Sequence, residues 1–262
     1  MELSGKTYWL VGASEGLGRA LAKKLDAEGV HVVLSARNKD RLDELADEMS
    51  DRTMVLPTDV SDIEKVEAAA VQLPDIDGFI YAAGTYTPFG AQDYDAKAAE
   101  MMFEVNLQGG SRIAATQIPK FAKRNHGHAV FIGSLSAFGG LPGSIGYSAS
   151  KAGLKSLAES IKCDLANTNV KVSHINPGFI RTRLTDKNTF DMPQIMEPEQ
   201  AADHVIRGMK RRRFETSFPY PFAMLFRLSR IFPEWLYFRI FGAAAAKEAP
   251  AKSGSLKSQA QS

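Results

Sequence analysis

A tyrosine and a lysine four residues apart are the most suggestive chemical pair in the sequence. Tyr147 and Lys151 lie in the segment YSASK, at the start of a stretch with helical periodicity. Residues four apart share one face of a helix, with about 6 Å of rise between them. A nearby ammonium favours the phenolate and lowers the phenol pKa from about 10. Such a tyrosine can exchange a proton with an alcohol or carbonyl oxygen, although the bare pattern occurs by chance in many helices.

Three polar positions are candidates for the same site. Ser134, in FIGSLSAFGG, follows an apolar run, and its hydroxyl could hydrogen-bond the same substrate oxygen. Asn106, in FEVNLQGG, falls in the middle of a helix by period, where asparagine is disfavoured unless its amide is used. Asn176, Pro177 and Gly178 end another apolar run and are followed by Thr182.

A glycine-rich loop precedes the first helical segment. The stretch VGASEGLGRA, residues 11–20, holds Gly12, Gly16 and Gly18 between an apolar run and a helix-like run. Glycines let a main chain approach a pyrophosphate, and a helix N-terminus supplies free N–H groups and partial positive charge. The spacing is G-x-x-x-G-x-G rather than G-x-G-x-x-G. A tight, closely packed strand-to-helix turn is the alternative interpretation.

The segment VVLSARNKDRL, residues 32–42, bears on the choice of cofactor. NAD sites often place an acidic residue here for the ribose 2′-hydroxyl, but this segment offers Arg37 after two small residues. An arginine provides a charge-assisted fork for a 2′-phosphate, so we predict NADP rather than NAD. A solvated arginine at a strand end is the alternative, and Glu15 in the glycine loop counts against the extra phosphate. Asp59 could accept from the adenine amino group or cap the following helix.

Short apolar runs alternate with helical segments along the chain. The strand-like runs are 8–11, 30–34, 54–56, 78–82, 129–133 and 170–175, and the helical segments are 17–28, 39–49, 62–73, 96–124 and 148–167. The runs have the continuous hydrophobicity of buried strands. The alternation predicts an α/β fold, a doubly wound parallel sheet of about seven strands with helices on both faces.

Taken in order and spacing, these motifs resemble the short-chain dehydrogenase/reductase family over roughly residues 3–210. The resemblance rests on GASEGLG (12–18), AAG (82–84), VN (105–106), GSLS (133–136), YSASK (147–151) and NPGFIRT (176–182). It is similar to the subgroup with a loop of this length and an arginine after the second strand, which usually prefers NADP. One departure stands out: Tyr81-Ala82-Ala83-Gly84 replaces the common N-N-A-G, so the bracing bonds of the asparagine side chain are lost, which puts local rigidity in doubt more than catalysis.

The resemblance implies a role for each motif residue. Tyr147 would be the proton donor or acceptor, Lys151 would lower its pKa and bind the nicotinamide ribose, and Ser134 would polarise the substrate oxygen. Asn106 would hold a water that links Lys151 to solvent. The cofactor would be bound by Gly12, Ser14, Glu15, Gly16, Leu17, Gly18, Arg37, Asp59, Val60, Ala82, Ala83, Gly84, Tyr147, Lys151, Pro177, Gly178, Ile180 and Thr182. The loop 186–198, where such enzymes select substrates, carries no readable code.

The C-terminal region departs from a simple end of the fold. We predict a catalytic domain over residues 1–213, a hydrophobic extension over 214–246 packed on it, and a disordered tail over 247–262. The extension should contain a strand at 215–218 and two short helices after Pro221 and Pro233. Met224, Leu225, Leu228 and Phe232 approximate one apolar stripe. Three interpretations remain open: packing on the domain or a second subunit, a lid over an apolar substrate, or peripheral membrane contact through 219–242.

Composition excludes several classes of protein. A net charge of +2 is too weak to indicate a nucleic-acid partner, and the single cysteine, Cys163, rules out an internal disulfide. The sequence shows no signal peptide, no apolar run long enough to span a bilayer and no metal-ligand cluster. We interpret His126 and His128 as loop residues and Cys163 as a small core residue. The single cysteine fits a reducing compartment, so we expect a cytoplasmic protein, and the resemblance implies a homodimer or homotetramer.

Two functions follow from these motifs. The first is an NADP-dependent oxidoreductase that interconverts a secondary alcohol and a ketone, or an aldehyde, on a fairly apolar small molecule. The second is an NADP(H)-binding regulator or scaffold with vestigial activity. A pure binder needs no proton-transfer set, so the presence of Asn106, Ser134, Tyr147 and Lys151 favours the enzyme.

Overall fold

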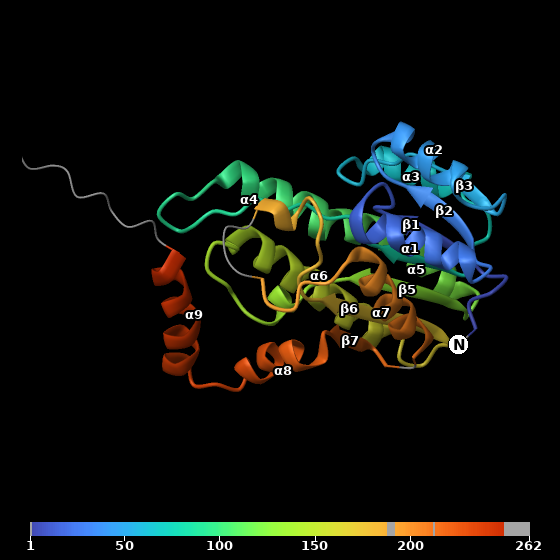
Figure 1. Cartoon of the computed structure of the whole chain (residues 1–262). Coiled ribbons are helices and arrows are strands. Elements are labelled where there is room, and N and C mark those ends of the chain that lie inside the picture. Colours follow the sequence, from blue (N-terminus) through green and yellow to red (C-terminus); the bar gives the residue numbers. More distant parts are fainter. Residues whose placement is uncertain (1, 188–191, 212, 249–262) are drawn as a thin grey trace, which may run out of the picture.

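Seven parallel strands form the centre of the computed structural model, which describes residues 2–187, 192–211 and 213–248 (Figure 1). The strands are β1 (Thr7–Val11), β2 (His31–Ser35), β3 (Thr53–Val55), β4 (Gly78–Tyr81), β5 (Gly127–Ile132), β6 (Val170–Pro177) and β7 (Glu215–Phe218). Their spatial order is β3-β2-β1-β4-β5-β6-β7. The order reverses between β1 and β4, the switch point at whose carboxyl edge doubly wound sheets bind ligands. The predicted fold class is confirmed.

The helices in the described residues connect these strands. They are α1 (Gly16–Ala27), α2 (Lys39–Asp47), α3 (Ile63–Gln72), α4 (Ala96–Phe103), α5 (Gly109–Lys123), α6 (Ile145–Asp164), α7 (Pro198–Lys210), α8 (Tyr220–Ser229) and α9 (Glu234–Glu248). A π-helical turn, Glu104–Gln108, joins α4 to α5, and short 3-10 turns cover Leu135–Phe138 and Thr185–Lys187. The periodicity analysis missed α7, although Pro198 in its first turn and Lys210 in its last are usual helix-end signals.

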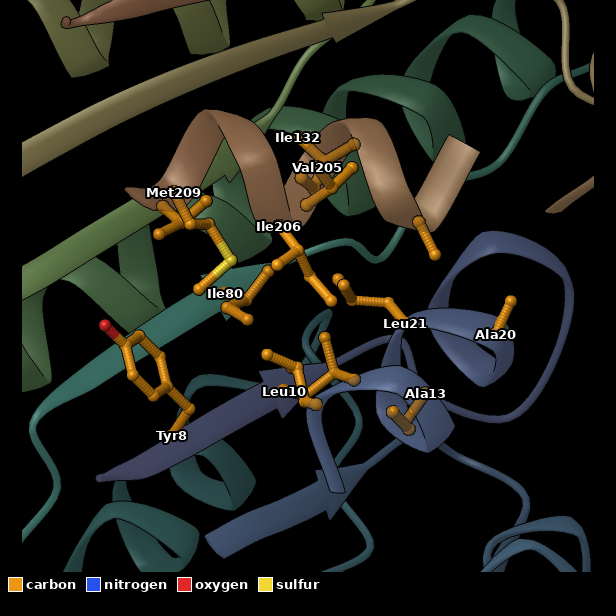
Figure 2. Close-up of a cluster of buried hydrophobic side chains, with 14 of the residues drawn as sticks. Tyr8, Leu10, Ala13, Ala20, Leu21, Ile80, Ile132, Val205, Ile206 and Met209 are labelled. Carbon is orange, nitrogen blue, oxygen red and sulfur yellow. The ribbon is translucent and has the colours of Figure 1, made fainter. Parts of the chain in front are cut away.

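Each face of the sheet packs against its own set of helices. Alternate strand residues point to opposite faces, so Leu10 and Ile80 lie with α1 and α7, whereas Trp9 and Phe79 lie with α3, α5 and α6. Figure 2 shows the first set, with Leu10 and Ile80 meeting Leu21 of α1 and helix α7. Because both faces are covered, the strands read as continuous apolar runs in the sequence.

Two residues differ from their predicted settings. His128 is not a loop residue: it lies in β5, is 2% exposed, and hydrogen-bonds to Tyr8 Oη and Ser173 Oγ, both at 2.9 Å. Cys163 is not a core residue: it lies exposed near the end of α6. The periodicity of that long helix did not reveal that its last turn leaves the core.

The free energy of unfolding should fall as the pH drops below about 6.5, because a buried histidine stays neutral in the folded protein. His174 of β6 is fully buried, and neither ring nitrogen has a hydrogen-bond partner among the described residues. Burial, followed by the positive charges of Lys155 and Lys151, lowers its pKa to about 3. The unfolded chain therefore binds more protons between pH 6.5 and 3, and stability is lost through that window at about 1.4 kcal/mol per pH unit.

Urea denaturation across this pH range tests the expectation. Burial also lowers the pKa of His128 well below its ordinary value, so both groups act in the same direction. His174→Phe should flatten the dependence by one proton. A His174→Phe curve parallel to the wild-type curve would contradict the argument.

The C-terminal extension has the predicted elements but buries a different face. Strand β7 matches the predicted range, and α8 and α9 follow it. In α8 the buried side chains are Ala223, Phe226 and Ser229, while Leu225 and Leu228 of the predicted stripe are 44% and 46% exposed. Periodicity could not show which face of α8 is buried, because this helix is apolar on both sides.

Helix α9 is the last helix of the described residues. Helix α9 continues to Glu248, and residues 249–262 of the predicted disordered tail lie outside the described residues. Among the described helices, none is both long and apolar enough to cross a membrane.

Candidate active site

Three predicted catalytic side chains meet at the carboxyl edge of the sheet. Tyr147 and Lys151 project from the first two turns of α6, with Lys151 Nζ 5.8 Å from the centre of the Tyr147 ring. Ser134, directly after β5, lies within hydrogen-bonding reach of the Tyr147 phenol. Lys151 is 4% exposed, and its Nζ donates to the carbonyl of Ile132 at 3.0 Å. The structure therefore brings the phenol, the ammonium and the hydroxyl together.

Burial governs the protonation of this group. It raises the pKa of Tyr147, an effect that the Ser134 hydrogen bond partly opposes, and it lowers the pKa of Lys151 to about 8. The lowered phenol pKa expected from Lys151 is thus not produced by the protein groups alone. Desolvation disfavours charge on both side chains, and it outweighs the effect of an ammonium whose Nζ lies 5.8 Å from the ring centre.

Asn106 lies in the π-helical turn and braces the site with its side chain. It is fully buried, and its Oδ1 accepts from Thr85 N at 2.7 Å while its Nδ2 donates to Thr85 O and Ser150 Oγ, both at 3.0 Å. Ser150 in turn donates to the Tyr147 carbonyl at 2.9 Å. The amide is therefore used, as its position predicted, to tie α6 to the loop after β4. π-Helical turns within helices are frequent at functional sites.

Tyr81 supplies the rigidity that the missing asparagine put in doubt. Its hydroxyl donates to the carbonyl of Val105, inside the same π-helical turn. The ring is fully buried at the end of β4, and Gly110 of α5 lies so close that an added Cβ would be 3.2 Å from it. A strand-to-helix hydrogen bond thus replaces the asparagine's bonds and fixes the turn that carries Asn106.

The three glycines of the loop lie where a Cβ would meet other atoms closely. A Cβ on Gly12, where φ is +97°, would lie 2.7 Å from the carbonyl carbon of Ala82, and one on Gly18 would overlap the Gly12 carbonyl oxygen. Gly16, with φ +54°, lies against the Thr182 methyl. The amides of Gly12 and Ala13 donate to the Ser35 carbonyl, which fixes the loop beside β2.

This loop fits a pyrophosphate. Helix α1 begins at Gly16, and its N-cap residue, Glu15, makes no side-chain capping hydrogen bond. The first N–H groups of α1 thus have no intrahelical partner and carry the partial positive charge of the helix terminus. A bare main chain at such a terminus is a phosphate cradle. The residues present therefore fit a nicotinamide dinucleotide.

The Glu15 carboxylate, which counted against a 2′-phosphate, is neutralised. It accepts from Arg41 Nη1 at 2.9 Å and from Arg183 Nη2 at 2.7 Å. Arg37 is exposed just after β2, and its charge contributes to lowering the pKa of Asp59. The sequence did not reveal either ion pair, because Arg41 lies 26 residues and Arg183 lies 168 residues from Glu15.

Asp59 is not the helix cap. Its Oδ1 accepts from the backbone N–H and the hydroxyl of Ser61, whereas the side chain of Asp62 caps α3 by accepting from Lys65 N. The adenine interpretation of Asp59 stays a prediction.

The remaining predicted cofactor residues lie on neighbouring segments. Ala82 donates to Val11 O at 2.8 Å, so the segment after β4 runs beside the end of β1. Gly84 approaches both Asn106 and Lys151: an added Cβ would be 3.5 Å from Asn106 Oδ1 and 3.7 Å from Lys151 Nζ. Ser14, Leu17, Val60, Ala83, Pro177, Gly178, Ile180 and Thr182 lie in or beside the segments that follow β1, β3, β4 and β6.

Comparison with known proteins gives one family. A family model described as short chain dehydrogenase matches residues 6–192. An uncharacterized oxidoreductase of Myxococcus xanthus (strain DK1622) is 32% identical over 243 residues, which cover 90% of this chain and 96% of that protein.

Two solved structures have a similar fold. A short chain dehydrogenase from Burkholderia cenocepacia J2315 in complex with NADP is 25% identical, with a TM-score of 0.83 over 92% of this chain and 99% of that one. A short chain dehydrogenase/reductase from Burkholderia phymatum in complex with NAD is 22% identical, with a TM-score of 0.80 over 87% and 94%, and shows the fold alone.

Proposed function

Since this chain belongs to the short-chain dehydrogenase family, we propose that it is an NADP-dependent oxidoreductase that interconverts a secondary alcohol and a ketone, or an aldehyde, on a fairly apolar small molecule. The observation that carries the proposal is the convergence of Tyr147, Ser134 and Lys151 beside the glycine loop's edge of the sheet. A protein that only bound the dinucleotide would not need a proton-transfer set.

Each of these side chains has a task at the substrate oxygen. The nicotinamide, when bound, supplies or accepts the hydride. Tyr147 exchanges a proton with the oxygen, and Ser134 donates a hydrogen bond that holds the oxygen in place and stabilises developing negative charge. Lys151, held by the Ile132 carbonyl, would bind the nicotinamide ribose and place a positive charge near the phenol, which opposes the effect of burial on the phenol pKa. Asn106 positions α6, and with it Tyr147, through Ser150.

Exposed arginines support the choice of NADP. Arg37 and Arg41 lie on the segment after β2, where an acidic residue would favour NAD. Glu15 is held between Arg41 and Arg183, so its carboxylate is compensated near the expected 2′-phosphate. The NADP complex of the Burkholderia cenocepacia relative supports the same choice.

Arg37→Ser should weaken NADPH binding about tenfold or more and leave NADH binding unchanged. A charge-assisted hydrogen bond contributes about 1.5–3 kcal/mol, and NADH lacks the phosphate that would accept it. Fluorescence titration with both cofactors measures the difference. Arg52→Ser, at an exposed arginine near the start of β3, is the matched control and should alter neither affinity. Equal losses of affinity for NADPH and NADH would show that Arg37 does not bind the 2′-phosphate.

Apolar side chains beside Ser134 favour an apolar substrate. Leu135 and Phe138 follow it and pack with Phe222 and Phe226 of α8. Purified protein should therefore oxidise NADPH with apolar ketones or aldehydes from a carbonyl panel, and more slowly with charged ones. NADPH binding without turnover of any carbonyl compound would instead favour the alternative function, an NADP(H)-binding regulator or scaffold.

A further inference from the structure

Many of the exposed large apolar side chains lie on the C-terminal helices. Of the thirteen exposed large hydrophobic residues in the described part of the chain, seven lie between residues 220 and 240: Tyr220, Leu225, Leu228, Ile231, Trp235, Phe238 and Ile240. Trp235 and Phe238 are 66% and 67% exposed, and Ile231 is 77% exposed. We call the side of α8 and α9 that carries these side chains the outer face; so many exposed apolar residues on two consecutive helices favour contact with a partner.

The inner face of the same helices is already occupied. Phe226 of α8 and Phe241 of α9 pack with Leu135 and Phe138, the residues that follow Ser134. Tyr237 donates to the Gly140 carbonyl at 2.6 Å and holds α9 on the same loop. Helix α9 lies at the edge of the molecule away from the sheet, at the left in Figure 1. The outer face is thus a distinct surface, backed by the loop of the candidate active site.

The charges on the outer face are nearly all positive. Arg227, Arg230 and Arg239 are exposed among the apolar residues, and Glu234 is the only acidic residue between 216 and 242. Arg227 has Glu215 within 3.4 Å, whereas Arg230 and Arg239 form no ion pair within the described ranges. A second copy pairing through this face about a two-fold axis would bring these arginines together, which opposes self-association.

We propose that the outer face of α8 and α9 seats on the surface of a membrane containing anionic lipids. Aromatic and aliphatic side chains would enter the boundary between headgroups and acyl chains, and Arg230 and Arg239 would contact anionic headgroups. This occupant matches both the apolar character and the charge of the face. If the proposed function holds, membrane contact also indicates a substrate class. The substrate would be a carbonyl compound dissolved in the lipid layer, which reaches Ser134 past the helices α8 and α9 that pack on the loop after β5.

Trp235 fluorescence provides a direct test with the full chain. The protein has two tryptophans, and Trp9 is fully buried in β1, so a change on adding lipid reports Trp235. Vesicles containing equal amounts of phosphatidylglycerol and phosphatidylcholine should shift the emission to the blue and carry the protein in flotation. Vesicles of phosphatidylcholine alone should bind more weakly. Salt at 1 M, where the Debye length is about 3 Å, should abolish that preference.

Two pairs of substitutions separate the apolar and electrostatic contributions. Trp235→Glu with Phe238→Glu should lower vesicle binding at least about a hundredfold, because charge is placed where apolar side chains insert. Arg230→Gln with Arg239→Gln should lower binding to the anionic vesicles about thirtyfold, from roughly fivefold per arginine. The control is Val71→Glu, at an 85% exposed apolar position on α3, which should bind like the wild type.

Other outcomes overturn the proposal. The absence of any blue shift or flotation would rule out membrane binding by the outer face. A wild-type dimer in sedimentation that Trp235→Glu with Phe238→Glu converts to a monomer would assign the face to a second copy. The vesicle measurements need neither NADPH nor substrate, and turnover of a water-soluble ketone is measured separately. A failure of membrane binding would therefore not contradict the proposed oxidoreductase activity. An absence of turnover would likewise not contradict membrane binding.

Discussion

Tyr147→Phe should lower turnover of a carbonyl substrate by about 10³-fold or more and leave the affinity for NADPH within a factor of about two of the wild type. General acid–base catalysis contributes about 10²–10⁴-fold to the rate. The substitution also removes the phenol oxygen that accepts a hydrogen bond from Ser134. The substitution removes one oxygen and keeps the ring that packs edge-on against Tyr86, with 5.1 Å between ring centres. The fold and the glycine loop are therefore expected to be unaffected.

Steady-state kinetics and cofactor titration on the same preparation check this result. Tyr94→Phe, at an exposed tyrosine that packs against Phe89, is the matched control and should keep full turnover. If Tyr147→Phe retained wild-type turnover, the phenol would not be the proton carrier and the proposed reaction would fail. A fall in NADPH affinity equal to the fall in turnover would instead assign Tyr147 a binding role.

The residues of the catalytic group were predictable because their signals are local. Tyr147 and Lys151 are one helical turn apart, and Ser134 lies two residues after an apolar strand, so their spacing made them candidates and the resemblance to the family assigned their roles. Parallel strands end at one edge of a sheet, and this rule brought the glycine loop to the same place. The fold class followed from the same alternation of buried runs and amphipathic helices.

Other parts of the site depend on contacts between distant segments, which periodicity does not contain. Tyr81 reaches Val105, 24 residues away, and nothing in the segment Tyr81–Gly84 identifies that partner. The Glu15–Arg183 pair joins residues 168 positions apart. The pKa of Tyr147 was expected to fall because the lysine was visible in the sequence, whereas the burial that raises it became visible only in the fold.

Helix α8 shows a second reason why prediction failed. Its sequence is apolar around most of its circumference, so the inner and outer faces look alike to a pattern of spacing. The inner face is selected by the shape of the loop around Leu135 and Phe138, which only the tertiary structure defines. The exposure of Leu225 and Leu228 in the apolar stripe is informative, because an ordinary surface helix would have a polar side to expose.

Gly18→Ala should lower the free energy of unfolding by about 3 kcal/mol or more and weaken NADPH binding at least about tenfold. Gly18 is buried in the first turn of α1, and a methyl group there would overlap the Gly12 carbonyl oxygen and lie 2.8 Å from its carbon. Neither backbone segment can yield cheaply, because Gly12 is itself confined by Ala82 and Ala83. Forcing atoms into a packed region costs about 1–3 kcal/mol or more, and here the displaced segment is the cradle proposed for the pyrophosphate.

Thermal denaturation with and without NADPH measures both parts of this expectation. The melting temperature should fall by about 10 °C, and the further stabilisation that NADPH gives the wild type should be largely lost, because a weaker ligand shifts the folding equilibrium less. Gly90→Ala and Gly140→Ala are matched controls, since a Cβ at either position would meet nothing within 4 Å. If Gly18→Ala melted with the controls and kept its response to NADPH, the close packing of the loop would have no bearing on the cofactor. If it lost stability but kept NADPH affinity, Gly18 would serve the strand-to-helix turn alone, which is the alternative that the glycine spacing left open.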